Sequence, residues 1–375
     1  MDPSHLLRRS STKINGTGRE RSFLPPRGST GVATRSTGVP TRSAVRYDDD
    51  TLDEQGPSDI AHEQLRKGPD LETDGFSPRT AFFCASLSSS MYSDARVVQD
   101  LFEDIGITSF KWFTRDVDAP WSPLGVMADT QGAVGATPTF IVAAFRGTQE
   151  PEDWATNLKV VPKDFHSWGQ CHAGFMEGVD TVWGEEGNDG MLAYIKSLYE
   201  EHPRPVLLAG HSLGAALASI AGARLAAVHE IPVHGIYTIG SPRVFDKKAA
   251  AAYDAHVNAG KTMKEKTFRA VNCNDCVTTV PPEPPAFHVG TLILINRRGE
   301  LKTDEHWEAV RQQFEAVFKK GEFADFVPNH DSMRYLGAFK RAIEEVEGIP
   351  DIVAALEAED QEEVKEPVEE EGKAA

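Results

Sequence analysis

The sequence predicts an α/β domain in which a mostly parallel central sheet is covered by helices. Short apolar runs that do not alternate with polar residues are typical of strands buried on both faces of a sheet. Segments with helical periodicity lie between these runs, and this alternation favours parallel strands. The expected strands span 139–145, 205–210, 235–240, 267–272 and 289–295. The expected helices lie within 175–202 and over 213–228, 246–259, 304–318 and 332–345.

The polar ends of the chain bound this domain. Residues 1–75 comprise a basic segment rich in Ser and Arg and then a polar linker, a composition too poor in apolar residues to fold. The acidic residues 356–375 are expected to be a disordered tail. This leaves 76–355 as the folded domain. An organelle transit peptide is the alternative for the N-terminal segment, because such peptides are rich in Arg and Ser and poor in acids.

Composition excludes several classes of function. The 375 residues carry a net charge of −18 at pH 7, and an acidic chain does not neutralise the phosphates of nucleic acids. Four cysteines are too few for a disulfide-dense secreted scaffold. No stretch approaches the roughly 20 apolar residues of a membrane-spanning helix. The first residues lack the apolar core of a secretory signal, so we expect an intracellular, cytoplasmic protein.

The segment Gly210–Gly214 reads Gly-His-Ser-Leu-Gly, and it follows an expected strand and precedes an expected helix. A serine at such a strand–turn–helix junction has its hydroxyl exposed on a strained turn, where it serves as a nucleophile. The two glycines suit a turn too tight for Cβ atoms. The amide of Leu213 begins the helix and is oriented to stabilise an oxyanion. Ser212 is therefore the candidate nucleophile, and an ordinary turn serine is the alternative.

Six short motifs follow one another in the part of the chain that covers about residues 75–345. They are Phe145–Thr148, Trp154 with Asn157 and Leu158, His172–Phe175, Gly210–Gly214, Thr238–Arg243, and Asn274 and Asp275 with Pro281 and Pro282. In this order they resemble the motifs of the class 3 lipases. The resemblance implies an α/β-hydrolase fold, a triacylglycerol lipase or related esterase activity, and no metal or cofactor.

The resemblance also assigns roles to residues. Ser212 corresponds to the nucleophile, and Asp275, which comes soon after an expected strand, corresponds to the acid of a Ser-His-Asp triad. His330 and His288 both follow Asp275, as the order of the triad requires. His330 is favoured as the base because it lies in a loop before the final helix, as the family's base does. His288 begins an apolar strand, where a hydrogen-bonded structural histidine is the usual interpretation.

The segment expected to form the lid of the site is acidic. The resemblance assigns the oxyanion hole to the amides of Thr148 and Leu213, and the lid to 149–157. An opened lid lies on lipid, and the three acids within 150–153 would be repelled by an anionic bilayer. We therefore expect weak interfacial activation and a preference for soluble or monomeric esters.

Cys273 and Cys276 flank Asp275 in a Cys-x-x-Cys pattern. We expect reduced thiols, because no second pair completes a zinc site and no helix is expected to begin here. A reversible disulfide that modulates activity is the alternative.

These patterns predict a serine hydrolase that cleaves carboxylic esters of lipids, with its substrate at a membrane or droplet surface. A phospholipase, galactolipase or short-chain carboxylesterase on the same triad is the alternative. A non-catalytic lipid-binding module is less favoured, because the chain carries a full set of Ser, Asp and His. No nucleic-acid partner is expected.

Overall fold

The central sheet has eight strands in the order β1-β2-β3-β6-β7-β10-β11-β12. It belongs to a computed structural model that describes residues 59–114, 130–148, 161–184, 189–273, 275–303 and 328–347. Parallel pairing runs from β3 to β11, whereas β1 and β2 at one edge and β12 at the other are antiparallel. The strands of this sheet are β1 (Ser109–Thr114), β2 (Gln131–Ala136), β3 (Ile141–Phe145), β6 (Val206–His211), β7 (Val233–Ile239), β10 (Thr267–Asn272), β11 (Thr291–Ile295) and β12 (Leu301–Lys302).

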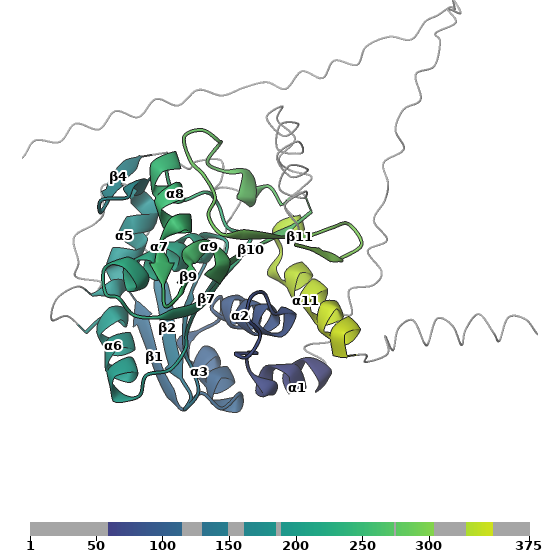
Figure 1. Cartoon of the computed structure of the whole chain (residues 1–375). Coiled ribbons are helices and arrows are strands. Elements are labelled where there is room, and N and C mark those ends of the chain that lie inside the picture. The colour runs from purple at the N-terminus through teal and green to yellow at the C-terminus, as the bar shows by residue number, and fades with distance from the viewer. Residues whose placement is uncertain are drawn as a thin grey trace, which may run out of the picture. The chain divides into compact units, whose positions relative to one another are not determined.

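Helices cover both faces of the sheet (Figure 1). One face packs against α5 (Ala173–Trp183), α6 (Met191–Glu201), α7 (Leu213–Ala227) and α8 (Lys247–Ala255). The other packs against α2 (Pro78–Ser90), α3 (Ala95–Asp104) and α11 (Ser332–Glu347). The smaller elements are α1 (Asp59–Lys67), α9 (Met263–Lys266), a 3-10 turn over Val277–Thr279, and two short hairpins, β4 (Pro162–Phe165) with β5 (Gly169–His172) and β8 (Val257–Asn258) with β9 (Lys261–Thr262).

Alternate side chains of each buried strand enter two separate apolar cores. In β3, Ile141, Ala143 and Phe145 join the core beneath α7, whereas Val142 and Ala144 join the core beneath α2. Both sets are buried, which is why the strand appears as an unbroken apolar run in the sequence. The predicted α/β class with a mostly parallel sheet is confirmed, and the five expected strands are β3, β6, β7, β10 and β11.

Two expected segments differ in the structure. The helix expected within 175–202 is two helices, because Gly184 ends α5 in the left-handed region at φ 64°. Part of the segment 1–75, which we expected to contain only disordered chain and linker, forms α1. Leu65 of α1 is buried in the core beneath α2, and Arg66 pairs with Asp104 of α3 at 2.7 Å. The burial of Leu65 gives α1 an apolar contact that the polar composition of residues 1–75 did not predict.

Several expectations lie outside the described residues. These are the acidic lid over 149–157, the helix over 304–318, the basic segment before residue 59 and the acidic tail over 356–375. Among the helices that the structure describes, none has the length and apolar content needed to cross a membrane.

Candidate active site

The strand β6 turns into α7 at a single strained residue, Ser212. Its backbone has φ 59° and ψ −128°, a combination that non-glycine residues rarely adopt. The Ser212 amide donates to the carbonyl of Ile239 in the next strand at 2.9 Å, so the turn is tied to the sheet. This is the geometry of a nucleophile elbow, which raises the serine above the carboxyl end of the sheet.

The two glycines of the elbow are required by close backbone packing. A Cβ on Gly210 would lie 2.1 Å from the carbonyl oxygen of Gly214, and a Cβ on Gly214 would lie 2.3 Å from the carbonyl oxygen of Phe145. Both distances are far below any real contact, and the obstacle is backbone that cannot move aside. The prediction that this turn leaves no room for Cβ atoms is confirmed.

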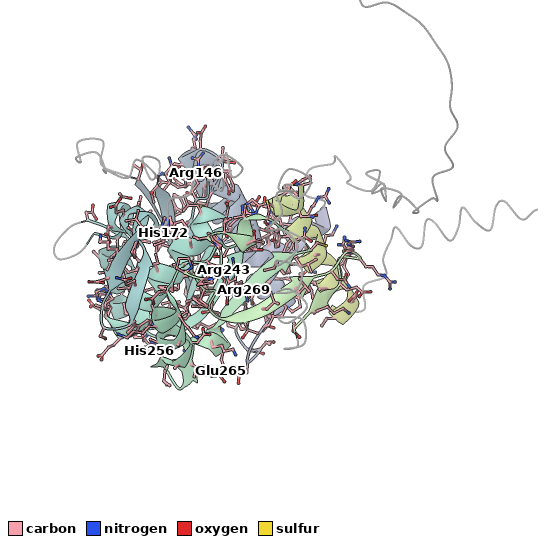
Figure 2. All side chains as sticks on the ribbon, turned by 90° about the horizontal axis from the view of Figure 1, so that it is seen from above. Arg146, His172, Arg243, His256, Glu265 and Arg269 are labelled. Carbon is pink, nitrogen blue, oxygen red and sulfur yellow. The ribbon has the colours of Figure 1, made fainter. Side chains whose placement is uncertain are left out.

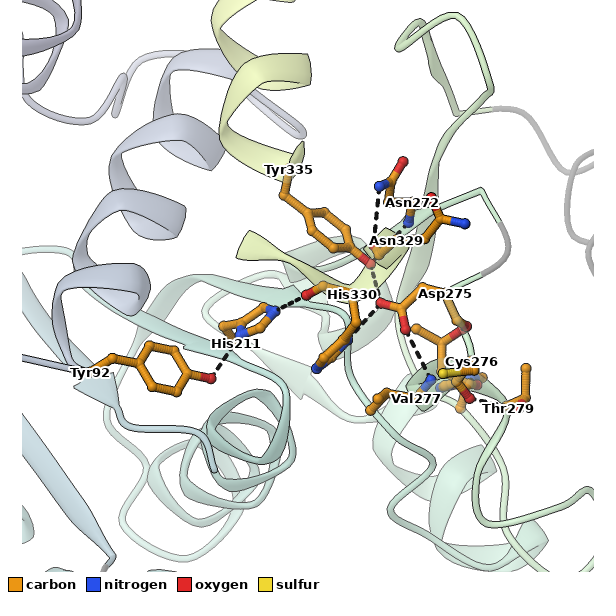
Figure 3. Close-up of polar contacts among 12 residues, drawn as sticks. Tyr92, His211, Asn272, Asp275, Cys276, Val277, Thr279, Asn329, His330 and Tyr335 are labelled. Carbon is orange, nitrogen blue, oxygen red and sulfur yellow. Dashed lines mark hydrogen bonds and ion pairs between the residues drawn. The ribbon is translucent and has the colours of Figure 1, made fainter. Parts of the chain in front are cut away.

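The carboxylate of Asp275 is fully buried and accepts hydrogen bonds at both oxygens (Figure 3). Oδ2 accepts from His330 Nδ1 at 2.9 Å and from the Tyr335 hydroxyl at 2.5 Å, and Oδ1 accepts from the Val277 amide at 2.9 Å. Burial alone would raise the pKa of Asp275, but the nearby His330 imidazole and the hydrogen bonds from His330 and Tyr335 outweigh it and hold that pKa below its usual value. The acid therefore remains ionised beside the imidazole.

The hydrogen bond to Asp275 fixes the state of His330. A carboxylate only accepts, so Nδ1 carries the proton and Nε2 is left as the basic nitrogen. Nε2 is buried and has no hydrogen-bond partner among the described residues, and the same is true of Ser212 Oγ. The other candidate, His288, bonds through Nε2 to the carbonyl oxygen of Thr278 at 2.8 Å. The geometry thus brings Asp275 together with His330, and it gives His288 a structural bond instead.

A buried chain of hydrogen bonds joins the elbow to the loop that carries His330 (Figure 3). His211, next to Ser212, bonds through Nε2 to the backbone carbonyl of His330 at 2.8 Å, and its ring stacks on the His330 ring at 4.5 Å. Because a carbonyl only accepts, Nε2 of His211 is protonated, and Nδ1 accepts from the Tyr92 hydroxyl at 2.8 Å. Burial, together with nearby His330, lowers the pKa of His211 to about 3, so this ring stays neutral.

Sequence reasoning missed three residues of this arrangement: Tyr92, His211 and Tyr335. Tyr335 receives a hydrogen bond from the Asn272 amide at 3.0 Å while it donates to Asp275. Tyr92 follows α2, and no motif marks it in the sequence. The only available signal was position, since Tyr335 lies close after His330 and His211 lies directly before Ser212.

The end of β3 lies beside the elbow, where we expect the oxyanion hole. β3 pairs with β6 so that Phe145 is opposite Gly210. Gly147 packs so tightly that an added Cβ would lie 2.6 Å from the carbonyl oxygen of His211. Thr148 is the next residue, and the amide of Leu213 is the first of α7, which has no acceptor within the helix. The role of both amides stays a prediction.

None of the four cysteines forms a disulfide in the described part of the chain. Cys276 is buried, and Cys273, which has φ 45°, is half-buried. In the part of the chain that the structure describes, no group of three or more His, Cys, Asp or Glu side chains is placed to hold a metal ion.

Comparison with known proteins relates one segment of the chain to a known family. Residues 142–284 match the family model described as lipase (class 3). Over this segment the chain is similar to class 3 lipases. The resemblance inferred from the six motifs is therefore confirmed, and the matched segment includes Ser212 and Asp275.

Two curated proteins and one solved structure indicate how far the similarity extends. The putative lipase LIH1 of Saccharomyces cerevisiae is 26% identical over 191 residues, which cover 42% of this chain and 55% of that protein. Phospholipase A1-II 6 of Oryza sativa subsp. japonica is 25% identical over 270 residues, or 63% of this chain and 64% of that protein. The chain therefore spans between half and two thirds of the length of these relatives.

The solved structure of the Rhizomucor miehei triacylglyceride lipase is 21% identical, with a TM-score of 0.50 over 66% of this chain and 90% of that structure. At this identity the match concerns the fold alone, and it agrees with the expected α/β-hydrolase architecture.

Proposed function

We propose that this class 3 lipase domain is a serine hydrolase that cleaves carboxylic esters of lipids, with Ser212 as nucleophile, His330 as base and Asp275 as acid. One observation carries the proposal. A buried carboxylate orients the His330 imidazole so that its basic Nε2 has no partner, and the residue before a strained, equally unpartnered serine stacks on that imidazole. Buried serine hydroxyls and imidazole nitrogens usually have hydrogen-bond partners, so their absence at Ser212 and His330 within the described residues supports a role in the chemistry.

The chemistry follows from this arrangement. His330 Nε2 removes the proton of Ser212 as Oγ attacks the ester carbonyl, and the imidazolium that forms is stabilised by Asp275. The amides of Leu213 and Thr148 receive the oxyanion, aided by the N-terminal dipole of α7. His330 then protonates the departing alcohol, and water repeats the sequence on the acyl-enzyme.

We propose glycerolipids as the substrate class, reached at a membrane or droplet surface. The family assignment of residues 142–284 supports lipid esters, and a relative named phospholipase A1 supports phospholipids as the second candidate. The acidic composition of 149–157 supports weak interfacial activation. The intracellular location stays a prediction, which imaging of the tagged full-length chain tests.

An ester panel tests the proposal. The full-length chain is assayed on short and long p-nitrophenyl esters, emulsified triglyceride and phospholipid, with Ser212→Ala as control. We expect turnover of long-chain glyceride or phospholipid that disappears in the variant, and covalent labelling of Ser212 by a fluorophosphonate. Turnover of short esters alone would restrict the function to an esterase. Absence of both turnover and labelling would favour the non-catalytic lipid-binding module.

A further inference from the structure

A second cleft lies at the opposite edge of the sheet, where the parallel strands begin. This amino-edge cleft, lined by Tyr199, Arg204, His234, Lys266 and Phe268 among others, has a volume of about 600 Å³. That volume lies within the range of small-molecule sites. In Figure 2, Glu265 of the cleft lies on the opposite side of the molecule from Arg146, which follows β3 next to the elbow. The cleft is thus separate from the catalytic residues.

Lys266 places a buried cation in the wall of this cleft. Its side chain is only 6% exposed, and its ammonium donates to the carbonyl oxygen of Val233 at 2.7 Å and to Asn258 Oδ1 at 3.3 Å. Among the described residues it has no ion-pair partner. An ammonium has three donors, so one remains for a further acceptor. Burial, together with the neighbouring Lys261, lowers the pKa of Lys266 by more than the nearby carboxylate of Glu265 raises it.

Arg204 adds a second cation at the same edge of the sheet. It precedes β6, whose first residue Val206 pairs with Val233, the residue that accepts from Lys266. The Nε atom of Arg204 is buried and has no hydrogen-bond partner, and the described residues supply no ion pair to its guanidinium. His234 also lines the cleft, and burial together with Lys266 lowers its pKa, so its neutral ring adds a polar contact without charge.

The carboxylates that border the cleft are already engaged. Asp74 pairs with Lys261. Glu265 accepts from the amide of Thr262 at 2.9 Å and from its hydroxyl at 2.6 Å, in the capping box that starts α9. Neither carboxylate bonds to Arg204 or Lys266. The cleft therefore presents positive charge on a chain whose net charge is −18.

We propose that the amino-edge cleft binds a small organic oxyanion, a phosphate or carboxylate attached to an aromatic or apolar body. The guanidinium of Arg204 matches the two oxygens of such a group, and the free donor of Lys266 adds a third contact. Tyr199 and Phe268 in the cleft wall supply apolar surface for the body. A buried ammonium whose hydrogen bonds go to neutral oxygens is further stabilised by an anion, and this contributes to the binding free energy of the ligand.

Calorimetric titration of the full-length chain tests this site, with no ester present so that the outcome does not depend on hydrolysis. The probes are phenyl phosphate, benzoate, inorganic phosphate and neutral phenol. We expect saturable binding of phenyl phosphate or benzoate, and comparison of the two identifies the preferred oxyanion. Arg204→Gln should weaken that binding about tenfold or more. The matched control is Arg297→Gln, at an exposed arginine on the turn after β11, which should change binding less than about twofold.

Other outcomes would overturn the proposal. If phenol bound as tightly as phenyl phosphate or benzoate, the cleft would be an apolar pocket without preference for an anion. If inorganic phosphate bound as tightly as phenyl phosphate, the aromatic or apolar body would have no part in recognition. Absence of binding, or binding that Arg204→Gln leaves unchanged, would reject the site. Should Arg204→Gln fail to fold, as judged by circular dichroism, Lys266→Met provides the same comparison from the other cation.

Discussion

The two ends of the central sheet treat buried charge in opposite ways. At the carboxyl end, Asp275 is fully buried, but it accepts from an imidazole, a tyrosine hydroxyl and a backbone amide. At the amino end, Lys266 is nearly as buried, yet the acceptors recorded for its ammonium are a carbonyl and an amide oxygen, both neutral. A buried charge is stable when it is paired or well hydrogen-bonded. The charge at the carboxyl end is thus satisfied by hydrogen bonds within the protein. The ammonium at the amino end has a donor left, and we propose that a ligand accepts from it.

The largest effect is expected from Ser212→Ala. Removal of the nucleophile should lower kcat/KM by at least about 10⁴-fold, because the rest of the triad acts only through it. The melting temperature should remain close to that of the wild type, since Oγ has no hydrogen-bond partner among the described residues. Steady-state kinetics and thermal unfolding check both parts. Substantial residual turnover would assign the reaction to another residue.

The next largest effect is expected from Asp275→Asn. The amide cannot balance the imidazolium, so kcat should fall on the order of 10³- to 10⁴-fold. Stability should also depend on pH. Because the pKa of Asp275 is lower in the folded state than its ordinary value of 3.8, the carboxylate stabilises the fold above that value, and this contribution is lost as pH falls through the folded pKa. Urea unfolding of both chains between about pH 7 and pH 3 should show the wild-type advantage shrinking with acid; a constant difference would contradict the assignment.

Tyr92→Phe should have an intermediate effect. It leaves the buried Nδ1 of His211 without its donor, which costs about 1–3 kcal/mol of unfolding free energy. It also loosens the His330 loop, so kcat should fall about tenfold, with little change in KM. The control is Tyr194→Phe, because the hydroxyl of Tyr194 makes no hydrogen bond within the described ranges. A loss of stability without any loss of kcat would limit Tyr92 to a structural role.

The smallest effect is expected from Lys266→Met, which tests the amino end of the comparison. Removal of a buried ammonium that has no ion pair among the described residues should change the unfolding free energy at pH 7 by less than about 1 kcal/mol. The pKa of Lys266 is lower in the folded state than its ordinary value of 10.5, so its charge opposes folding at low pH, and the penalty disappears as pH rises toward 10.5. The wild type should therefore gain stability relative to Lys266→Met as pH rises from the folded-state pKa to 10.5. The exposed Lys264→Met is the control, and a large loss at pH 7 would show that Lys266 is fully compensated.

The sequence was informative where chemistry and local geometry coincide. The elbow could be predicted because Gly210, Ser212 and Gly214 occupy consecutive alternate positions between a strand and a helix. The buried parallel strands could be predicted because both of their faces are apolar. The choice of His330 over His288 rested on position relative to a helix, and the structure brings His330 to Asp275.

Features built from distant segments could not be predicted. β2 reads Gln-Gly-Ala-Val-Gly-Ala and has no strand signature; its Gly135 is needed because Phe102 and Ile107 pack where a Cβ would lie. Tyr92 reaches His211 across 119 positions, and the amino-edge cleft gathers residues from before α2 to β10. Such contacts depend on the register of the sheet, which no single segment specifies.

A single strand spans the distance between the two ends. Arg204 lies just before β6 and Ser212 just after it, and eight residues of extended chain cover about 26 Å. β6 is buried along its whole length and is hydrogen-bonded to β3 on one side and to β7 on the other. We therefore expect this strand to be rigid. Because β6 is not expected to bend or slide, a structural change at one of its ends should not be transmitted to the other. Ligand binding in the cleft and ester hydrolysis are therefore expected to be independent, so that a mutation can change either one without affecting the other.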